Sequence, residues 1–514
     1  MDGWLSLCFI AGSTLLAIWF LDLSRRRNNP NKKLPPGPWT LPIVGSLLHV
    51  VGAFPHRTIA ELSRRHGPLM HLRLGEVATM VVSSAEVAAM VLKTNDLTFA
   101  DRPRTVTQDI FGSGGKDIAF APYGAAWRQM RKVCVMEILG SKQARRMERI
   151  RTEEVGNLLR SIVITASAGA GAGATVNVSE KVAMLSNDVV SRAVFGGTVA
   201  QRDEYIRELG EAMELVTGFC LVDIFPSSRL VRWLNSVERR MRRSYGRMQS
   251  IIADILDERK AARAAGDGSC STDDEDLLEV LLRLQAEDSL GFPLTTEIIG
   301  AVMFDMFAGG TDTTATVLEW AMSELVNNPE AMTKAQLEVR EVLGEDRVII
   351  TNCDIAKLPY MRMVIKEVLR LHPPIPLVPR MARDDCNIMG YDMLKGTNVL
   401  VNVFAISRDS RYWENPEEFK PERFENNNMD YNVTYFEFIP FGAGRRQCPG
   451  MFFGISTVHI TLANMLYHFN WMLPEGACLT SFDMSEKFGL TIRRRYDLQL
   501  RAIPWVGVKD ILLR

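Results

Sequence analysis

The alternation of apolar and polar positions predicts a mainly helical chain with a small sheet. Between Leu69 and Val82 the pattern indicates a β-hairpin that turns near Gly75, and a helix capped at Ser83 or Ser84 follows it. After this hairpin, strand signals are few until the last third of the chain, and most segments have helical spacing. We therefore expect a mainly α fold with a small β subdomain near the N-terminal side.

Helical spacing is clearest in one long apolar stretch, which runs from Thr296 to Val326 and is closed by Pro329. As a helix it would extend for roughly 45 Å. Two low-complexity segments, at 166–174 and 261–276, interrupt the helical pattern elsewhere. Both are most simply flexible surface connections between helices.

The N-terminal residues form a separate region. The apolar run from Trp4 to Leu21 holds 18 residues, which as a helix rise about 27 Å and span a hydrocarbon core. Three arginines follow this run at 25–27, whereas a cleaved signal peptide would carry its basic end first. Since positive charges stay on the cytosolic side, we predict three regions in order: a retained single-pass transmembrane anchor at 1–24, a basic and proline-rich hinge at 25–40, and one cytosolic domain at 41–514.

Composition and charge exclude some classes of protein. The 514 residues, 47% of them hydrophobic, can bury a large core, and a net charge of −1 gives no electrostatic basis for binding nucleic acid. The basic run at 239–243 is by default a solvated helix face, with contact to anionic membrane headgroups as the alternative. Eight cysteines lack C-x-x-C or paired spacing, which argues against a zinc site or a disulfide framework and for a reducing compartment.

One cysteine stands in a distinctive loop. From Phe441 to Gly450 the sequence reads Phe-Gly-Ala-Gly-Arg-Arg-Gln-Cys-Pro-Gly, a glycine-rich turn that presents Cys448 and then enters a helix. Backbone N–H groups in such a turn can stabilise a thiolate. A thiolate between Phe441 and Arg446 suits a large flat metal cofactor that carries a carboxylate. A small buried hydrophobic cysteine is the alternative.

The spacing Phe-x-x-Gly-x-Arg-x-Cys-x-Gly, filled by Phe441, Gly444, Arg446, Cys448 and Gly450, resembles the heme-binding signature of the cytochrome P450 family of heme-thiolate monooxygenases. The anchor, the proline hinge and this loop are most similar to the plant A-type microsomal members. The resemblance implies the cytochrome P450 fold and heme b, with Cys448 as axial iron ligand whose thiolate favours O–O cleavage. It also implies residence in the endoplasmic reticulum membrane.

The centre of the long apolar stretch is a poor helix sequence. Ala308 begins the run Ala-Gly-Gly-Thr-Asp-Thr-Thr, in which two adjacent glycines cost on the order of 2 kcal/mol relative to alanine and threonine hydroxyls compete for backbone carbonyls. A kinked helix that passes over a ring and leaves room for a diatomic ligand would use these features. The run resembles the family's oxygen-binding motif, which implies that Asp312 and Thr313 form the acid–alcohol pair that supplies protons to dioxygen.

Three further positions resemble the family's ligands of the heme propionates. Trp127 and Arg131 are four residues apart and share a face if their segment is helical. The resemblance implies that they donate hydrogen bonds to a propionate. Arg380 takes the same role at the end of a segment that begins at His372 and cannot be helical, because it contains four prolines.

A charged group resembles the family's buried Glu-Arg-Arg network. Glu367 and Arg370 are three residues apart and can pair on a helix, and Arg423 completes the set. We assign these three residues a structural role. Loss of one should release heme through loss of the fold, since a buried unpaired charge is costly.

The position of further residues in the family implies an apolar substrate pocket. The expected substrate is a small apolar plant specialised metabolite, with a terpenoid first and a phenylpropanoid or an alkaloid next. The predicted substrate contacts are Phe111, Phe219, Phe304, Ala308, Gly309, Pro374, Ile375, Leu377 and Phe488.

The implied reaction is a hydroxylation that uses O2 and two electrons from NADPH. NADPH acts only through the implied partner, NADPH-cytochrome P450 reductase, for which Arg128, Lys132 and Arg445 are basic contacts, and cytochrome b5 is a second implied electron donor. A heme-thiolate isomerase or dehydratase that does not use O2 is an alternative, but such members depart from the pattern at the oxygen helix or the cysteine loop. A non-enzymatic heme protein is the other alternative, and it would not need the pair formed by Asp312 and Thr313.

Overall fold

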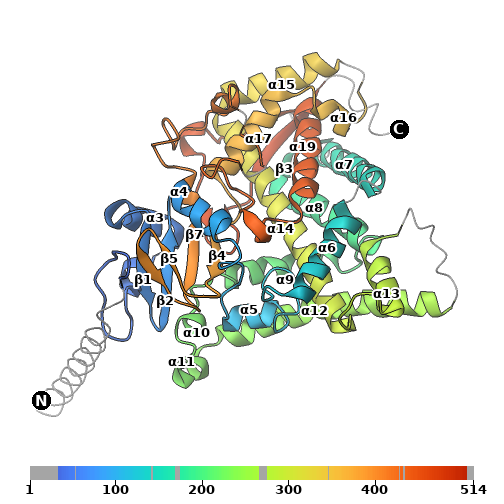
Figure 1. Cartoon of the computed structure of the whole chain (residues 1–514). Helices are drawn as coiled ribbons and strands as arrows, with labels where there is room; N and C mark the ends of the chain where they lie inside the picture. The colour runs from blue at the N-terminus through green and yellow to red at the C-terminus, as the bar shows by residue number, and fades with distance from the viewer. Residues whose placement is uncertain are drawn as a thin grey trace, which may run out of the picture.

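Helix α14 (Thr296–Asn327) runs through the middle of the molecule, as Figure 1 shows. The Thr295 side chain caps its first turn by accepting a hydrogen bond from the N–H of Ile298. The helix is apolar on nearly all sides, so neighbours cover it all round: α8 (Val178–Phe195), α17 (Pro359–Leu371) and α19 (Met451–His468) pack against it. The predicted long helix is confirmed and ends one residue later than expected.

The computed structural model describes residues 33–52, 54–139, 143–167, 174–265, 275–344, 347–427, 429–431 and 434–505. The predicted anchor at 1–24 and the hinge as far as residue 32 lie outside these ranges. Within them, no helix combines the length and the apolar character needed to cross a bilayer.

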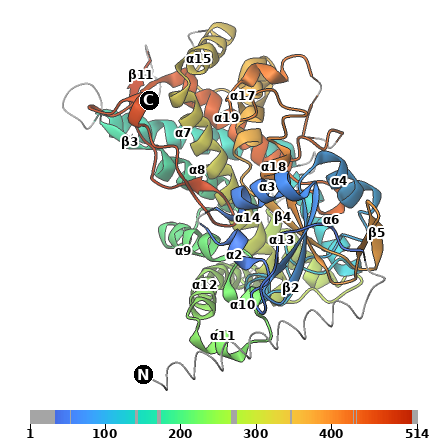
Figure 2. The ribbon, with the colours of Figure 1, turned by 90° about the vertical axis from the view of Figure 1, so that its left-hand side faces the viewer.

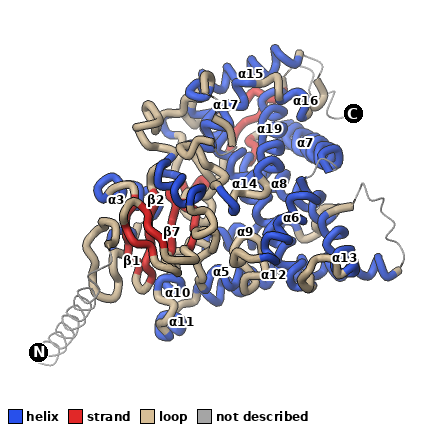
Figure 3. Tube along the Cα trace, viewed as in Figure 1, coloured by secondary structure: helices blue, strands red, loops and turns tan. Residues whose placement is uncertain are grey.

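The mainly helical fold with small sheets is confirmed, and Figure 3 shows how the helices outnumber the strands. The helix that follows the hairpin begins after Ser84, whose side chain accepts from the N–H of Val87, as predicted. The other helices are α2 (Leu47–Val50), α3 (Pro55–His66), α4 (Ala85–Ala89), η1 (Met90–Thr94), α5 (Val106–Phe111), α6 (Ala125–Leu139), α7 (Ala144–Ser167), α9 (Arg202–Leu215), α10 (Leu221–Ile224), α11 (Arg229–Leu234), α12 (Val237–Ala264), α13 (Leu277–Glu287), α15 (Pro329–Leu343), α16 (Asn352–Ile355), α18 (Val403–Ile406), η3 (Pro421–Phe424), η4 (Gly444–Arg446) and η5 (Leu479–Ser481).

The main sheet combines strands from the two ends of the chain. The predicted hairpin is present as β1 (Leu69–Leu74) and β2 (Val77–Val82), which are antiparallel. Strand β2 pairs in parallel with β7 (Asn398–Asn402), and β7 pairs antiparallel with β4 (Leu377–Met381). The sheet therefore lies beside the N-terminal region, as expected, but half of its strands come from the last third of the sequence.

Three smaller sheets complete the fold. Figure 2 shows β3 and β11 on the far side of the molecule from the main sheet. Their sheet has the order β3-β11-β8, and the other two sheets are two-stranded, β5 with β6 and β9 with β10. The bounds are β3 (Thr175–Asn177), β5 (Cys386–Ile388), β6 (Tyr391–Met393), β8 (Phe469–Met472), β9 (Glu486–Lys487), β10 (Arg493–Arg494) and β11 (Gln499–Pro504).

Candidate active site

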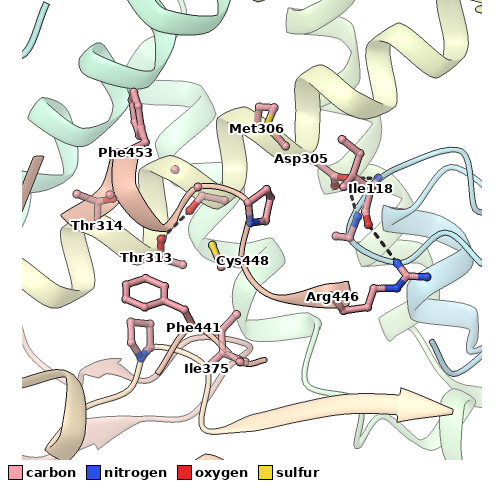
Figure 4. A pocket seen from close by; sticks show the side chains of 18 of the residues that line it. Ile118, Asp305, Met306, Thr313, Thr314, Ile375, Phe441, Arg446, Cys448 and Phe453 are labelled. Atoms are coloured by element: carbon pink, nitrogen blue, oxygen red, sulfur yellow. Dashed lines mark hydrogen bonds between the residues drawn. The ribbon is translucent and has the colours of Figure 1, made fainter. Parts of the chain in front are cut away.

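An internal cavity of about 340 Å³ lies between α14, the start of α19 and the segment that follows α17. Figure 4 shows parts of its wall: Asp305 and Thr313 come from α14, Ile375 from the segment after α17, and Phe453 from α19. Most of the lining surface is apolar. Such a cavity suits an apolar ligand that is oriented by few polar groups.

Cys448 points into this cavity (Figure 4). A hydrogen bond from its backbone N–H to the carbonyl of Phe441, at 3.0 Å, closes the loop that carries it. The accessible surface of Cys448 belongs to the cavity wall, because the residue lines the cavity. Burial raises the pKa of the Cys448 thiol, while the N–H of Gly450 and the charge of Arg131 act in the opposite direction. The loop thus provides a backbone donor of the kind expected for a thiolate.

The glycines of the loop have different roles. Gly450 lines the cavity beside Phe441. Gly444 does not line it: its φ is +71°, and a Cβ there would lie 2.4 Å from the carboxylate of Asp96 and 2.4 Å from the carbonyl of Leu92. Glycine is needed at this position because the backbone of the loop approaches Asp96 closely. Gly444 therefore shapes the loop that carries Cys448, and it is not on the cavity wall.

Four arginines converge beside the cysteine loop. Arg102, Arg131 and Arg446 line the cavity, and Arg380 is fully buried next to them. Their guanidinium groups donate only to backbone carbonyls, for example from Nε of Arg446 to Ala100 at 2.7 Å. Burial lowers the pKa of Arg380 and of Arg446 to about 9. In the part of the chain that the structure describes, none of the four forms an ion pair with a carboxylate.

This cluster fits an anionic ligand. Buried cations without counter-charges are costly, so a ligand that brings negative charge to this place would be stabilised strongly. Arginine also offers the paired N–H groups that match a carboxylate. The two propionates of heme would supply this charge, and Cys448 in the same cavity would supply a ligand for its iron.

Trp127 contacts two of these arginines through the face of its ring. Its indole N–H donates to the carbonyl of Ile118 at 2.9 Å, so it is not directed into the cavity. The face of the ring lies 4.1 Å from the guanidinium carbon of Arg446 and 5.5 Å from that of Arg131. In this structure the indole N–H that was predicted to reach a propionate bonds to the backbone, and the cation–π contacts position the two guanidinium groups.

The motif of α14 places its acid and its alcohol in different surroundings. Thr313 lines the cavity together with Gly309, and its hydroxyl donates to the Gly309 carbonyl at 2.7 Å. Asp312 is buried on another side of the helix, where it accepts a hydrogen bond from Thr491 at 2.5 Å and forms an ion pair with Arg493. Consecutive helical residues point about 100° apart, which explains the separation.

Three of the predicted substrate contacts line the cavity, namely Gly309, Pro374 and Ile375. Leu377, the first residue of strand β4, does not line it. Leu377 packs against a core on the other face, and Val378 lines the cavity in its place.

The four predicted aromatic contacts lie in the surrounding core and not on the cavity wall. Phe111 and Phe304 are buried and stack on each other with 6.5 Å between ring centres. Phe488 stacks on His56 at 5.7 Å and lies 6.1 Å from Phe219. Side-chain size and polarity predict burial for such residues but not the cavity they face. Ala308 is likewise buried in the core.

The lining residues that the sequence analysis did not identify include Arg102, Phe120 and Asp305. A signal for Asp305 exists, since it is the one carboxylate between Ile298 and Thr311 in an apolar run. Arg102 and Phe120 lie outside helices and strands, where no periodic pattern could have identified them.

The predicted charged network lies under the loop. Arg370 donates to Glu367 at 2.7 Å, and Arg423 donates to the same carboxylate at 2.8 Å. Glu367 and Arg370 are both completely buried. The network also ties the chain between η3 and β7, since Arg370 donates to the carbonyls of Ser407 and Pro416 at 2.9 and 2.7 Å.

The fit of a flat, doubly anionic metal cofactor between the thiol and the arginines puts this molecule in the class of heme-thiolate proteins. The sequence profile described as Cytochrome P450 matches residues 35–499. The chain belongs to the cytochrome P450 family, which implies heme iron with a cysteine thiolate ligand, and it is an oxidoreductase.

Two similar proteins are plant enzymes. The chain is 44% identical over 497 residues to 5-epiaristolochene 1,3-dihydroxylase of Nicotiana tabacum, a match that covers 96% of this chain and 98% of the relative. It is 45% identical over 511 residues to ent-isokaurene C2/C3-hydroxylase of Oryza sativa subsp. japonica, with 98% of each covered. Among solved structures, a zebra fish cytochrome P450 with progesterone superposes with a TM-score of 0.73 at 27% identity, over 88% of this chain and 100% of that one.

Proposed function

We propose that this chain is a membrane-anchored monooxygenase that hydroxylates a terpenoid, with O2 and with electrons from NADPH delivered by a reductase. The observation that carries the proposal is the single apolar cavity that Cys448 and Thr313 share. The names of the plant relatives, which are hydroxylases of sesquiterpenes and diterpenes, support the substrate class and favour an oxygenase over an isomerase.

The residues around the cavity would have separate roles in the reaction. Bound heme would supply the oxidising chemistry, with Cys448 as the iron ligand and the four arginines holding its propionates. The apolar walls at Ile375, Val378 and Leu490 would hold the substrate and exclude water. Orientation of the substrate then decides which carbon is hydroxylated.

Thr313 and Asp312 would control protons. The Thr313 hydroxyl donates to the Gly309 carbonyl, which leaves its oxygen free to accept a hydrogen bond from a water in the cavity. Asp312 holds a carboxylate on the outer side of α14, where Thr491 and Arg493 contact it. We assign Asp312 to proton supply from outside the cavity and Thr313 to delivery inside it.

Attachment to the endoplasmic reticulum membrane is part of the proposal, with an anchor at 1–24, a hinge at 25–40 and the catalytic domain at 41–514 in the cytosol. Large apolar side chains are exposed at Trp39, Leu48 and Val51 and, on α11, at Leu230 and Trp233. Figures 1 and 2 both show α11 at the edge of the molecule, next to α10. Exposed apolar side chains of this kind suit contact with a lipid surface.

Electron transfer requires a docking surface on the side of the cysteine loop. Arg128 and Lys132 are exposed on α6, and Arg445, which pairs with Asp96 at 3.2 Å, is exposed on the loop. We propose that these cations attract an acidic face of the reductase and of cytochrome b5.

The test is the absorption spectrum of the reduced, CO-bound protein in detergent, for wild type and for Cys448→Ser, followed by turnover with reductase and NADPH. We expect a strongly red-shifted Soret band that is lost in the variant, and hydroxylated products from sesquiterpene or diterpene hydrocarbons or their alcohols. A wild-type band at the position typical of histidine-ligated heme, or no NADPH-dependent product from a terpenoid panel, would refute the proposal.

A further inference from the structure

A carboxylate lines the cavity at a distance from the cysteine loop. Asp305 comes from α14, and Figure 4 shows it beside Ile118 on the cavity wall. One of its oxygens, Oδ2, accepts hydrogen bonds from the backbone N–H groups of Ile118 at 2.6 Å and of Ala119 at 2.9 Å. These two donors hold the carboxylate in one orientation.

The second oxygen of Asp305 is available to a ligand. Among the described residues no donor bonds to Oδ1, and this atom is not one of the buried unpaired atoms, so its accessible surface opens into the cavity that the residue lines. The adjacent lining residues Met306 and Phe120 are apolar. Of the described residues that line the cavity, Asp305 is the only one with a carboxylate.

In these surroundings it is energetically unfavourable for Oδ1 of Asp305 to lack a hydrogen-bond donor. A carboxylate oxygen in an apolar cavity loses hydration, and the cost is recovered only when a donor reaches it. A second carboxylate, Asp117, lies near and accepts from the N–H of Phe120 at 2.8 Å, but it does not line the cavity. Burial and the neighbouring Asp305 raise the pKa of Asp117, and among the described residues no hydrogen bond joins the two carboxyl groups. The group missing from the site is a hydrogen-bond donor on the ligand.

We propose that Asp305 selects substrates that carry a hydroxyl group, by accepting a hydrogen bond from that hydroxyl at Oδ1. This inference rests on the proposed function and deepens it, because it names an already oxygenated terpenoid as the substrate class. Eight residues of helix, about 12 Å, separate Asp305 from Thr313. A substrate held at Asp305 therefore presents its distant end to Cys448 and Thr313, and the product carries two oxygens at opposite ends of its skeleton.

The reaction that supplies such a substrate is an earlier hydroxylation of the hydrocarbon. A site that hydrogen-bonds a substrate hydroxyl rejects analogues that cannot donate, because its own polar atom is then left unpaired. Hydrogen bonds to charged groups are the stronger kind. We expect wild-type protein to prefer an alcohol over its methyl ether by about tenfold or more.

The test is equilibrium binding to the purified holoprotein, followed by the change in heme absorption. The ligands are 5-epiaristolochene and the regioisomeric mono-alcohols of its skeleton, each with the corresponding methyl ether. Burial raises the pKa of Asp305 to about 7, so measurements at pH 8 keep the carboxyl ionised. The variants are Asp305→Asn and Asp117→Asn. The first keeps an oxygen for the two backbone donors, and the second changes a neighbouring carboxyl group without changing the cavity wall.

We expect at least one alcohol to bind wild type about tenfold or more tightly than its ether, and the Asp117→Asn variant to keep this preference. In Asp305→Asn the preference should fall below about threefold, because the amide N–H can donate to an alcohol and to an ether alike. The inference is overturned if no alcohol is preferred by wild type, if Asp305→Asn keeps the preference, or if Asp117→Asn loses it as well. If the proposed function itself is wrong, the wild-type protein will not show the CO spectrum typical of thiolate-ligated heme, which distinguishes that failure from failure of this inference.

Discussion

Replacement of Glu367 by glutamine tests whether the buried network holds the heme pocket together. The carboxylate of Glu367 accepts from Arg370, from Arg423 and from the backbone N–H of Lys420, at 2.7 to 2.9 Å. Glutamine has nearly the same shape but one acceptor oxygen, and it leaves the guanidinium of Arg370 buried without a counter-charge. Breaking a buried pair in this way costs about 3–5 kcal/mol.

The expected shift in thermal stability follows from the size of the chain. For about 500 residues the entropy of unfolding is about 1 kcal/mol per kelvin, so the midpoint should fall by about 3–5 °C. The assay is the loss of the thiolate-type CO spectrum after heating, because this band requires both fold and heme. The matched control is Lys334→Gln, which breaks an exposed pair with Glu422 at 2.8 Å and should cost about 1 kcal/mol or less.

A second measurement separates the buried charge from simple loss of packing. The double variant Glu367→Gln with Arg370→Met removes both charges, so it should be less destabilised than the sum of the two single variants. The reasoning is refuted if Glu367→Gln melts within 1 °C of wild type, or if the two substitutions are additive.

Three other outcomes are expected. Gly310→Ala places a Cβ 2.6 Å from a side-chain carbon of α8 and should destabilise the protein by about 1–3 kcal/mol. The Cβ of Gly309→Ala meets nothing within 4 Å, so this variant should keep the thermal midpoint of wild type or raise it. Equal midpoints for the two variants would contradict this expectation. Arg102→Met should lower the ratio of heme to purified protein, and Arg104→Met, two residues away and exposed, should not; a normal ratio in both variants would show that Arg102 does not hold the cofactor. Hydrogen bonds from hydroxyls lower the pKa of the exposed Cys478 to about 7. Because the thiolate is the nucleophile, the rate of alkylation of Cys478 by iodoacetamide should rise with pH through 7 and then level off. Peptide mapping by mass spectrometry measures this rate, and a midpoint near pH 9 would contradict the lowered pKa.

Local patterns in the sequence were sufficient for the elements that carry the site. The apolar stretch from Thr296 predicted α14, the alternation after Leu69 predicted the hairpin, and the glycine-rich loop predicted the start of α19. Each of these signals comes from neighbours in the chain, because helix and strand periods are local.

The positions of the other site residues depend on contacts between segments that are distant in the sequence. Strand β4 is placed by its pairing with β7, and this pairing is not visible in the local sequence that made Leu377, rather than Val378, the predicted contact. Likewise, nothing near Trp127 in the sequence shows that the carbonyl of Ile118 takes its N–H. Arg102 follows Asp101, which pairs with Met381, and it donates to the carbonyls of Ala119 and Pro379, so contacts between distant segments place it at the site.

The parallel pairing of β2 with β7 has a consequence for biosynthesis. From Val82 to Asn398 the ribosome adds 316 residues, which takes about 20–60 s at common rates of synthesis. During this time β2 has an unpaired edge, the kind of surface that invites aggregation. Cys448 is synthesised later still, so no nascent chain shorter than about nine-tenths of the protein has the thiol that would bind the heme iron. Capture of heme through this thiol therefore belongs to the end of synthesis.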